Sequence, residues 1–129
     1  MGGPDSQDDV APFLFNLFSD REIIQLGPPF LQKPIAWFIS RRRAPKSRSI
    51  YGKIGGGSPL LAITLQQASA LQSRLRGKGD YIATVAMRYW PPLADEAVDF
   101  LLKQGVDSIT ALTLYPHFSK ATTGSSVLH

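Results

Sequence analysis

Two largely apolar runs, at residues 81–88 and 108–115, constrain this chain most strongly. β-Branched and aromatic residues fill both runs, which is typical of strands that are covered on both faces of a sheet. Apolar residues recur at helical spacing before and between the runs, which predicts helices over residues 8–19, 60–76 and 91–104. This alternation of helix and strand predicts an α/β fold with a parallel sheet and right-handed crossovers.

Prolines and glycines predict the remaining elements. Pro34 suits the first turn of a helix that runs to about Arg43, and a second, short helix is expected at residues 47–53. Residues 122–126 resemble a loop that enters a helix. Because two strands alone do not form a stable parallel sheet, we expect a strand before Met1 or strands from elsewhere. The 129 residues fit a single compact domain.

The composition is that of an ordinary globular protein, with 43% hydrophobic and 19% charged residues. The net charge of +4 comes largely from a basic run at residues 41–53, which is expected either to bind an anionic partner or to form a solvated helix face. The chain has no cysteine, which excludes disulfides and thiolate metal sites. No signal peptide or membrane-spanning run is visible, so the predicted location is the cytoplasm.

Ligands of open α/β sheets bind beyond the carboxyl ends of the strands. Residues 1–4, 88–90 and 115–119 are expected to converge there, and the glycine-rich turn at residues 55–59 is a candidate to join them. Glycine permits a close approach of the backbone to a ligand, and a helix amino end attracts anions. This turn matches neither a phosphate loop nor a dinucleotide fingerprint, and a simple tight turn before a helix is the favoured interpretation.

Other reaction classes find little support in the residues. His117 has no second metal ligand at a useful spacing, and Ser58, Ser119 and Ser125 have no visible base and acid partners. Arg88 ends a predicted buried strand, where its charge needs an anionic partner or solvent. Nucleic-acid binding through the basic run is disfavoured, because the nearby aromatic residues belong to apolar helix patterns.

Six segments together, in order and spacing, resemble the ferrochelatase family. They are Met1–Pro4, Phe13–Asp20, Ile54–Leu60, Met87–Pro92, Leu114–Ser119 and Thr122–Ser126. The resemblance covers essentially the whole chain but only the amino-terminal part of the family's length. It implies a chelatase-like three-layer parallel sheet with helices on both faces, of which residues 1–129 form one incomplete lobe. The implied activity is the insertion of ferrous iron into a porphyrin in heme biosynthesis.

The resemblance also implies a set of porphyrin-binding residues. The matching positions are Met1, Tyr51, Ser58, Arg88, Tyr89, Arg43 and Lys46. A porphyrin is a flat apolar disc with carboxylates at its edge, so it needs aromatic and apolar walls with cations at the rim. The family's metal-handling histidine and acid match no residue here, and His117 is not that histidine. The resemblance therefore implies no catalytic residue, no metal ligand and no resident cofactor in this chain.

The implied partners are the porphyrin, ferrous iron, and either the family's second lobe or another copy of the chain. A peripheral membrane contact is a further expectation, and nucleic acid is not expected. The isolated chain is predicted to insert no metal. Two alternatives remain open at this point: a small chelatase that forms its active site from two copies of a short chain, and a non-catalytic porphyrin- or heme-binding module.

Overall fold

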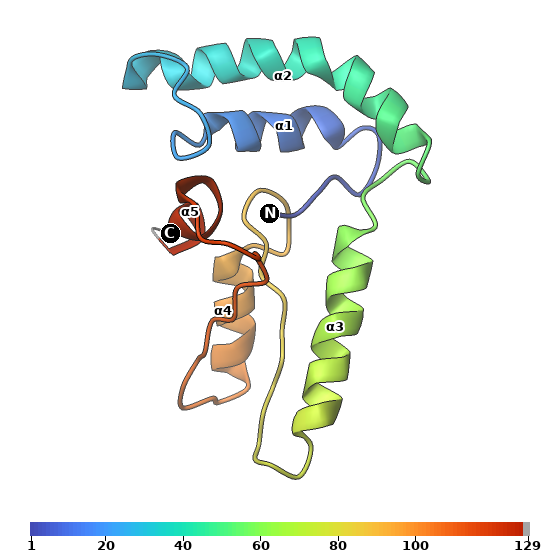
Figure 1. Ribbon diagram of the computed structural model, residues 1–129, viewed down its shortest axis with the longest axis vertical. Helices are drawn as coiled ribbons and strands as arrows, with labels where there is room; N and C mark the ends of the chain where they lie inside the picture. Colours follow the sequence, from blue (N-terminus) through green and yellow to red (C-terminus); the bar gives the residue numbers. More distant parts are fainter. Residues whose placement is uncertain (128–129) are drawn as a thin grey trace.

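The computed structural model describes residues 1–127, without the side chains of Lys120 and Val127. Figure 1 shows the helices of residues 10–19 and 29–52 side by side, and those of residues 60–75 and 94–103 extending away from this pair. The elements in chain order are α1 (Val10–Ser19), α2 (Pro29–Gly52), α3 (Leu60–Leu75), α4 (Ala94–Lys103), the π-helical turn η1 (Lys120–Gly124) and α5 (Ser125–Val127). The helices predicted at residues 8–19 and 60–76 are confirmed with boundaries shifted by one or two residues.

The α1–α2 pair contains most of the core. Helix α1 buries Val10, Phe13, Leu14 and Phe18, which lie on one face because their spacing follows the helical repeat. Helix α2 faces them with side chains that recur every fourth residue: Gln32, Ala36, Ser40 and Ala44. Three of these four side chains are small, so the two helix axes can approach closely. Tyr89 belongs to the same buried cluster and joins the pair to the second half of the chain.

Helix α2 differs from the prediction of two separate helices. It runs without interruption through Pro34 and Pro45, where the sequence predicted a first turn and a break between residues 43 and 47. Each internal proline removes one backbone hydrogen bond and crowds the preceding turn. The stripe that begins at Gln32 and ends at Ala44 is packed against α1 over three turns, and this burial outweighs the local cost of the prolines.

The predicted parallel sheet is absent from residues 1–127. Residues 81–88 and 108–115 are coil in the structure, and the described bridges consist of one isolated pair, Met87 with Leu93. No backbone hydrogen bond joins the two segments within the described residues. A strand is stable only when a neighbouring strand pairs with its N–H and C=O groups, and neither segment has such a neighbour here. The apolar side chains expected in a sheet core are therefore exposed, as Leu112 (69%) and Leu114 (63%) show.

Helices α3 and α4 are less buried than α1 and α2. No residue of α3 is buried, and α4 buries only Ala97 and Leu101. The carboxylate of Glu96 accepts a hydrogen bond from the Leu93 N–H (2.8 Å), which caps α4 at its amino end. The helix thus begins at Ala94, after the turn at residues 87–92 in which the sequence prediction started it. No helix within residues 1–127 has the length and apolarity needed to cross a bilayer.

Candidate functional site

Of the segments expected to converge, residues 1–4, the glycine-rich turn and residues 88–90 meet through backbone hydrogen bonds, and residues 115–119 reach them through Tyr115, whose hydroxyl accepts a hydrogen bond from the Met1 amino group (2.9 Å). The carbonyl oxygen of Met1 accepts hydrogen bonds from the N–H groups of Arg88 (3.3 Å) and Tyr89 (2.9 Å). On its other side, the Pro4 carbonyl accepts a hydrogen bond from the Ser58 N–H (2.7 Å). Residues 1–4 are thereby held between the glycine-rich turn and residues 88–90.

Two glycines permit this close approach. A Cβ atom on Gly57 would lie 2.1 Å from the Asp5 carbonyl oxygen, and one on Gly3 would lie 2.5 Å from Ser58 Oγ. These separations are shorter than any non-bonded contact that a carbon atom makes, so a side chain at either position would push the two segments apart. The glycine-rich turn therefore serves to pack the backbone of residues 3–5 against residues 57–58.

A buried polar cluster lies beside the meeting point. Oδ2 of Asp20 accepts hydrogen bonds from Tyr89 Oη (2.7 Å), Ser125 Oγ (2.5 Å) and Arg88 Nη2 (3.2 Å). Arg88 Nε also donates to the Ser125 carbonyl oxygen (3.1 Å) and to Ser125 Oγ (3.0 Å). The Asp20 and Arg88 side chains are 8% and 22% exposed, so the ion pair is largely shielded from solvent. The cluster thus joins the end of α1, residues 88–89 and the start of α5.

The cluster fixes the protonation of its members. Burial alone raises the pKa of Asp20, but the hydrogen bonds from Ser125, Tyr89 and the Glu22 N–H, together with the charge of Arg88, outweigh it and hold that pKa below its ordinary value. Burial is the main cause that raises the pKa of Tyr89 to about 12, and the neighbouring Asp20 carboxylate adds to it. At neutral pH Asp20 is therefore an acceptor and Tyr89 a permanent donor.

These shifts predict that stability depends on pH at both ends of the scale. Because the pKa of Asp20 is lower in the folded state, its contribution is present above the ordinary pKa of 3.8 and disappears as pH falls through the folded pKa. Because the pKa of Tyr89 is raised, its contribution is present below pH 10 and disappears as pH rises through about 12. Urea unfolding across pH should show both losses. The Tyr89→Phe variant should lose less stability at alkaline pH than the unsubstituted chain, with a remainder from Tyr51, whose pKa burial also raises. An unchanged alkaline slope would contradict the assignment.

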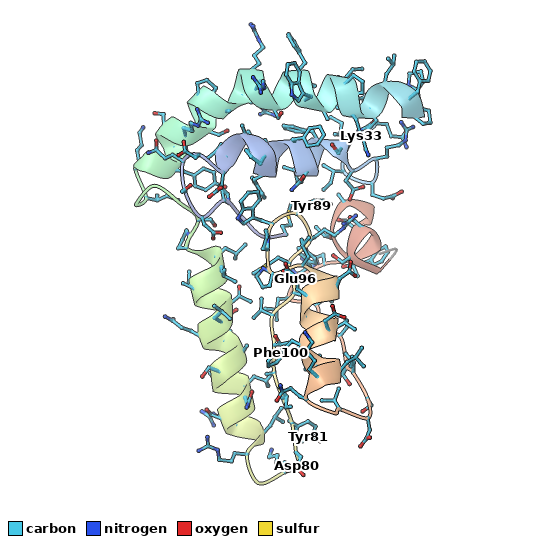
Figure 2. All side chains as sticks on the ribbon, turned by 180° about the vertical axis from the view of Figure 1, so that it is seen from behind. Lys33, Asp80, Tyr81, Tyr89, Glu96 and Phe100 are labelled. Atoms are coloured by element: carbon cyan, nitrogen blue, oxygen red, sulfur yellow. The ribbon has the colours of Figure 1, made fainter. Side chains whose placement is uncertain are left out.

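A cavity of about 590 Å³ opens next to the cluster. This volume lies within the range of small-molecule sites. Its walls come from the second half of α1, residues 20–22, Lys33 of α2, residues 88–89 and Leu93. Lys33 and Tyr89 are labelled in Figure 2. A second cavity of about 360 Å³ lies between α3 and residues 83–84, with Phe100 of α4 at its edge.

The predicted site residues fall into two groups. The Met1 carbonyl forms hydrogen bonds with the backbone N–H groups of Arg88 and Tyr89. Ser58 lies against Gly3, and the Tyr51 hydroxyl lies 3.9 Å from the position that a Cβ atom on Gly3 would take. The structure thus brings together the first group, Met1, Tyr51, Ser58, Arg88 and Tyr89.

Arg43 and Lys46 form the second group. They are exposed on α2, and the guanidinium of Arg43 lies over the Phe18 ring at 5.5 Å. No hydrogen bond or ion pair joins either cation to the first group within residues 1–127. His117 is also exposed, and the described residues contain no group of three His, Cys, Asp or Glu side chains able to hold a metal.

Sequence reasoning missed Asp20 and Ser125 as site residues. Both lie inside motifs that carried the family resemblance, Asp20 at the end of residues 13–20 and Ser125 within residues 122–126. The available signal was an acidic residue directly after an apolar helix, together with an arginine that needed an anionic partner. No rule of local spacing connects positions that are 68 and 105 residues apart.

Comparison with known proteins identifies the family. The sequence model described as Ferrochelatase matches residues 1–129. The chain belongs to the ferrochelatase family. Membership implies a chelatase-like α/β fold, although residues 1–127 contain no strand.

Three curated ferrochelatases illustrate the similarity. The one from Desulfotalea psychrophila (strain LSv54 / DSM 12343) is 62% identical over 127 residues, which are 98% of this chain and 40% of that protein. The one from Geotalea daltonii (strain DSM 22248 / JCM 15807 / FRC-32) is 56% identical over 98% of this chain and 39% of its own length. The one from Synechococcus sp. (strain CC9311) is 55% identical over 98% and 32%. The chain therefore spans about a third to two-fifths of the length of these ferrochelatases.

Proposed function

We propose that this chain forms one wall of the porphyrin cleft of a ferrochelatase, an enzyme that inserts ferrous iron into a porphyrin. The observation that carries the proposal is the meeting of Met1, residues 57–58 and residues 88–89 in one place. These segments are far apart in the sequence, and each belongs to a motif that resembles the family.

The two groups of site residues together supply the chemistry that a porphyrin requires. Met1 is 38% exposed and offers a flexible apolar side chain, and the half-buried Tyr51 has its hydroxyl near Gly3. Arg43 and Lys46 are exposed cations suited to the carboxylates at the edge of the ring. We assign these four residues to the porphyrin face, with Ser58 at its rim.

Arg88 and Tyr89 contribute differently. Tyr89 is only 3% exposed, and the hydroxyl already bonds to Asp20 and Ser125. Arg88 is neutralised by Asp20. We infer that Arg88 and Tyr89 form a fixed polar surface beside the porphyrin, and that the Tyr89 hydroxyl does not accept the pyrrole protons.

Metal insertion requires the two pyrrole protons to leave the ring. The resemblance places the proton acceptor and the iron ligand in the family's second lobe, which we propose as the main partner of this chain. A cytoplasmic location, with peripheral membrane contact, also belongs to this proposal.

We predict that the purified chain binds a porphyrin but does not metallate it. Addition of the chain should shift the porphyrin's visible absorption band, and Arg43→Ala should weaken binding about threefold because one rim cation is lost. The matched control is Arg74→Ala, which removes an exposed arginine from α3, far along the chain. The measurement is an absorbance titration with and without zinc or ferrous ion.

The outcomes separate the candidate functions. An unchanged absorption spectrum would overturn the proposal. If the spectrum does change, an equal loss of porphyrin affinity in Arg43→Ala and Arg74→Ala would also overturn it. Catalytic metal insertion by the isolated chain, together with a stable dimer in sedimentation, would instead support the small homodimeric chelatase.

A further inference from the structure

One buried carboxylate holds together three segments that surround the proposed porphyrin site. Asp20 Oδ2 is the point at which donors from Arg88, Tyr89 and Ser125 meet, and Asp20 Oδ1 accepts a hydrogen bond from the Glu22 N–H (2.8 Å). Both oxygens are therefore occupied by groups of this chain. A carboxylate that is 8% exposed and fully bonded is unsuited to bind a ligand directly, so its effect on a ligand is transmitted by its partners.

The partners lead from Asp20 to Met1. The side chains of Arg88 and Tyr89 are fixed by Asp20, and the backbone N–H groups of the same two residues hold the Met1 carbonyl. The Tyr89 carbonyl in turn accepts a hydrogen bond from Asn16 Nδ2 (3.0 Å), so residues 88–89 are anchored on both sides. Movement of the two side chains would therefore displace Met1.

We propose that Asp20 is a positioning residue, which fixes Arg88 and Tyr89 and thereby sets the place of Met1 on the porphyrin face. This inference rests on the proposed porphyrin-binding function. Ser125 shares this positioning role, because its hydroxyl contacts Asp20, Arg88 and Tyr89 at once. Through Ser125, the same carboxylate holds the start of α5 against residues 88–89.

The deciding substitution is Asp20→Asn, which keeps the shape of the side chain and removes its charge. We expect porphyrin affinity to fall about tenfold, since the Arg88 guanidinium loses its counter-charge and an NH2 donor replaces one of the two acceptor oxygens. The expected effect is on the dissociation constant, measured by absorbance titration well below the unfolding temperature of every variant.

Two controls distinguish positioning from general loss of stability. Leu101→Ala removes a buried side chain of α4 outside the cluster, so it destabilises the protein but should leave the porphyrin dissociation constant within about twofold. Asp8→Asn, an exposed position before α1, should change neither stability nor affinity. The proposal is overturned if Asp20→Asn binds porphyrin like the unsubstituted chain, or if Leu101→Ala loses affinity equally.

A measurement without porphyrin tests the contact between Asp20 and Tyr89 separately. Asp20→Asn should lower the pKa at which Tyr89 ionises, because the neighbouring carboxylate helps to raise it. An ultraviolet titration measures this, with Tyr89→Phe identifying the signal of this tyrosine. An unchanged Tyr89 midpoint in Asp20→Asn overturns the positioning role. If the Tyr89 ionisation midpoint shifts in Asp20→Asn but the unsubstituted chain binds no porphyrin, the contacts of Asp20 are supported. In that case the proposed function is overturned instead.

Discussion

Replacement of Gly57 by alanine is expected to lower the free energy of unfolding by at least about 2 kcal/mol. The new Cβ would lie 2.1 Å from the Asp5 carbonyl oxygen and 2.7 Å from the Asp5 carbonyl carbon. Both are backbone atoms, which cannot rotate away as a side chain does. Residues 4–5 would have to move, which would break the hydrogen bond from the Ser58 N–H to the Pro4 carbonyl. Porphyrin binding should be lost together with stability.

Gly52→Ala is the matched control for this substitution. Gly52 is the last residue of α2, and a Cβ there would approach only Gln7 Nε2, at 3.1 Å. That atom lies at the end of a flexible side chain, and alanine favours the helix over glycine by about 0.5–1 kcal/mol. The control should therefore be neutral or slightly stabilising. Urea unfolding followed by circular dichroism gives both values, and equal midpoints for the two variants would refute the packing role of Gly57.

Gln32→Leu is the second substitution with a large expected effect, and it should lower the free energy of unfolding by about 3 kcal/mol. Gln32 is 3% exposed and satisfies three backbone groups, one in the last turn of α1 and two in the α1–α2 connection. Its Nε2 donates to the carbonyls of Phe18 (2.8 Å) and Ile24 (2.9 Å), and its Oε1 accepts from the Leu26 N–H (3.1 Å). Leucine has a similar size but no polar atom, so these groups would lose their partner, at about 1–3 kcal/mol each where they remain buried.

The same change at Gln25 provides the comparison. Gln25 is exposed in the same connection, so Gln25→Leu should alter stability by less than about 0.5 kcal/mol. Thermal unfolding measures the difference, and hydrogen exchange should show faster exchange of the Leu26 amide in Gln32→Leu only. If both leucine variants unfold at the same temperature, the three hydrogen bonds of Gln32 do not stabilise the connection.

The helices were the most predictable part of the fold. Residues 8–19 and 60–76 carry a helical repeat with clear stop signals, and α1 and α3 follow it. Helix α2 was predicted as two pieces, because Pro34 and Pro45 interrupt its local pattern. The packing stripe of α2 is visible in the sequence, but it becomes informative only when a partner helix is known.

The sheet was the largest difference. The apolar runs at residues 81–88 and 108–115 have the composition of buried strands, yet they form no strand here. The composition of a run shows that it would fit the interior of a sheet. It does not provide the neighbouring strands whose backbone groups would complete the hydrogen bonds.

The sequence by itself determined the family and the α1 and α3 helices, because these depend on local periodicity and on short motifs. It also predicted that residues 1–4, 57–58 and 88–89 meet, but from a sheet edge that residues 1–127 do not form. Only the tertiary structure decided that α2 is continuous, that Gln32 holds the α1–α2 connection, and that Asp20 is the acceptor for Arg88, Tyr89 and Ser125. The physical reason is that a buried polar group takes its partner from whatever the fold brings near, and sequence distance carries no information about that choice.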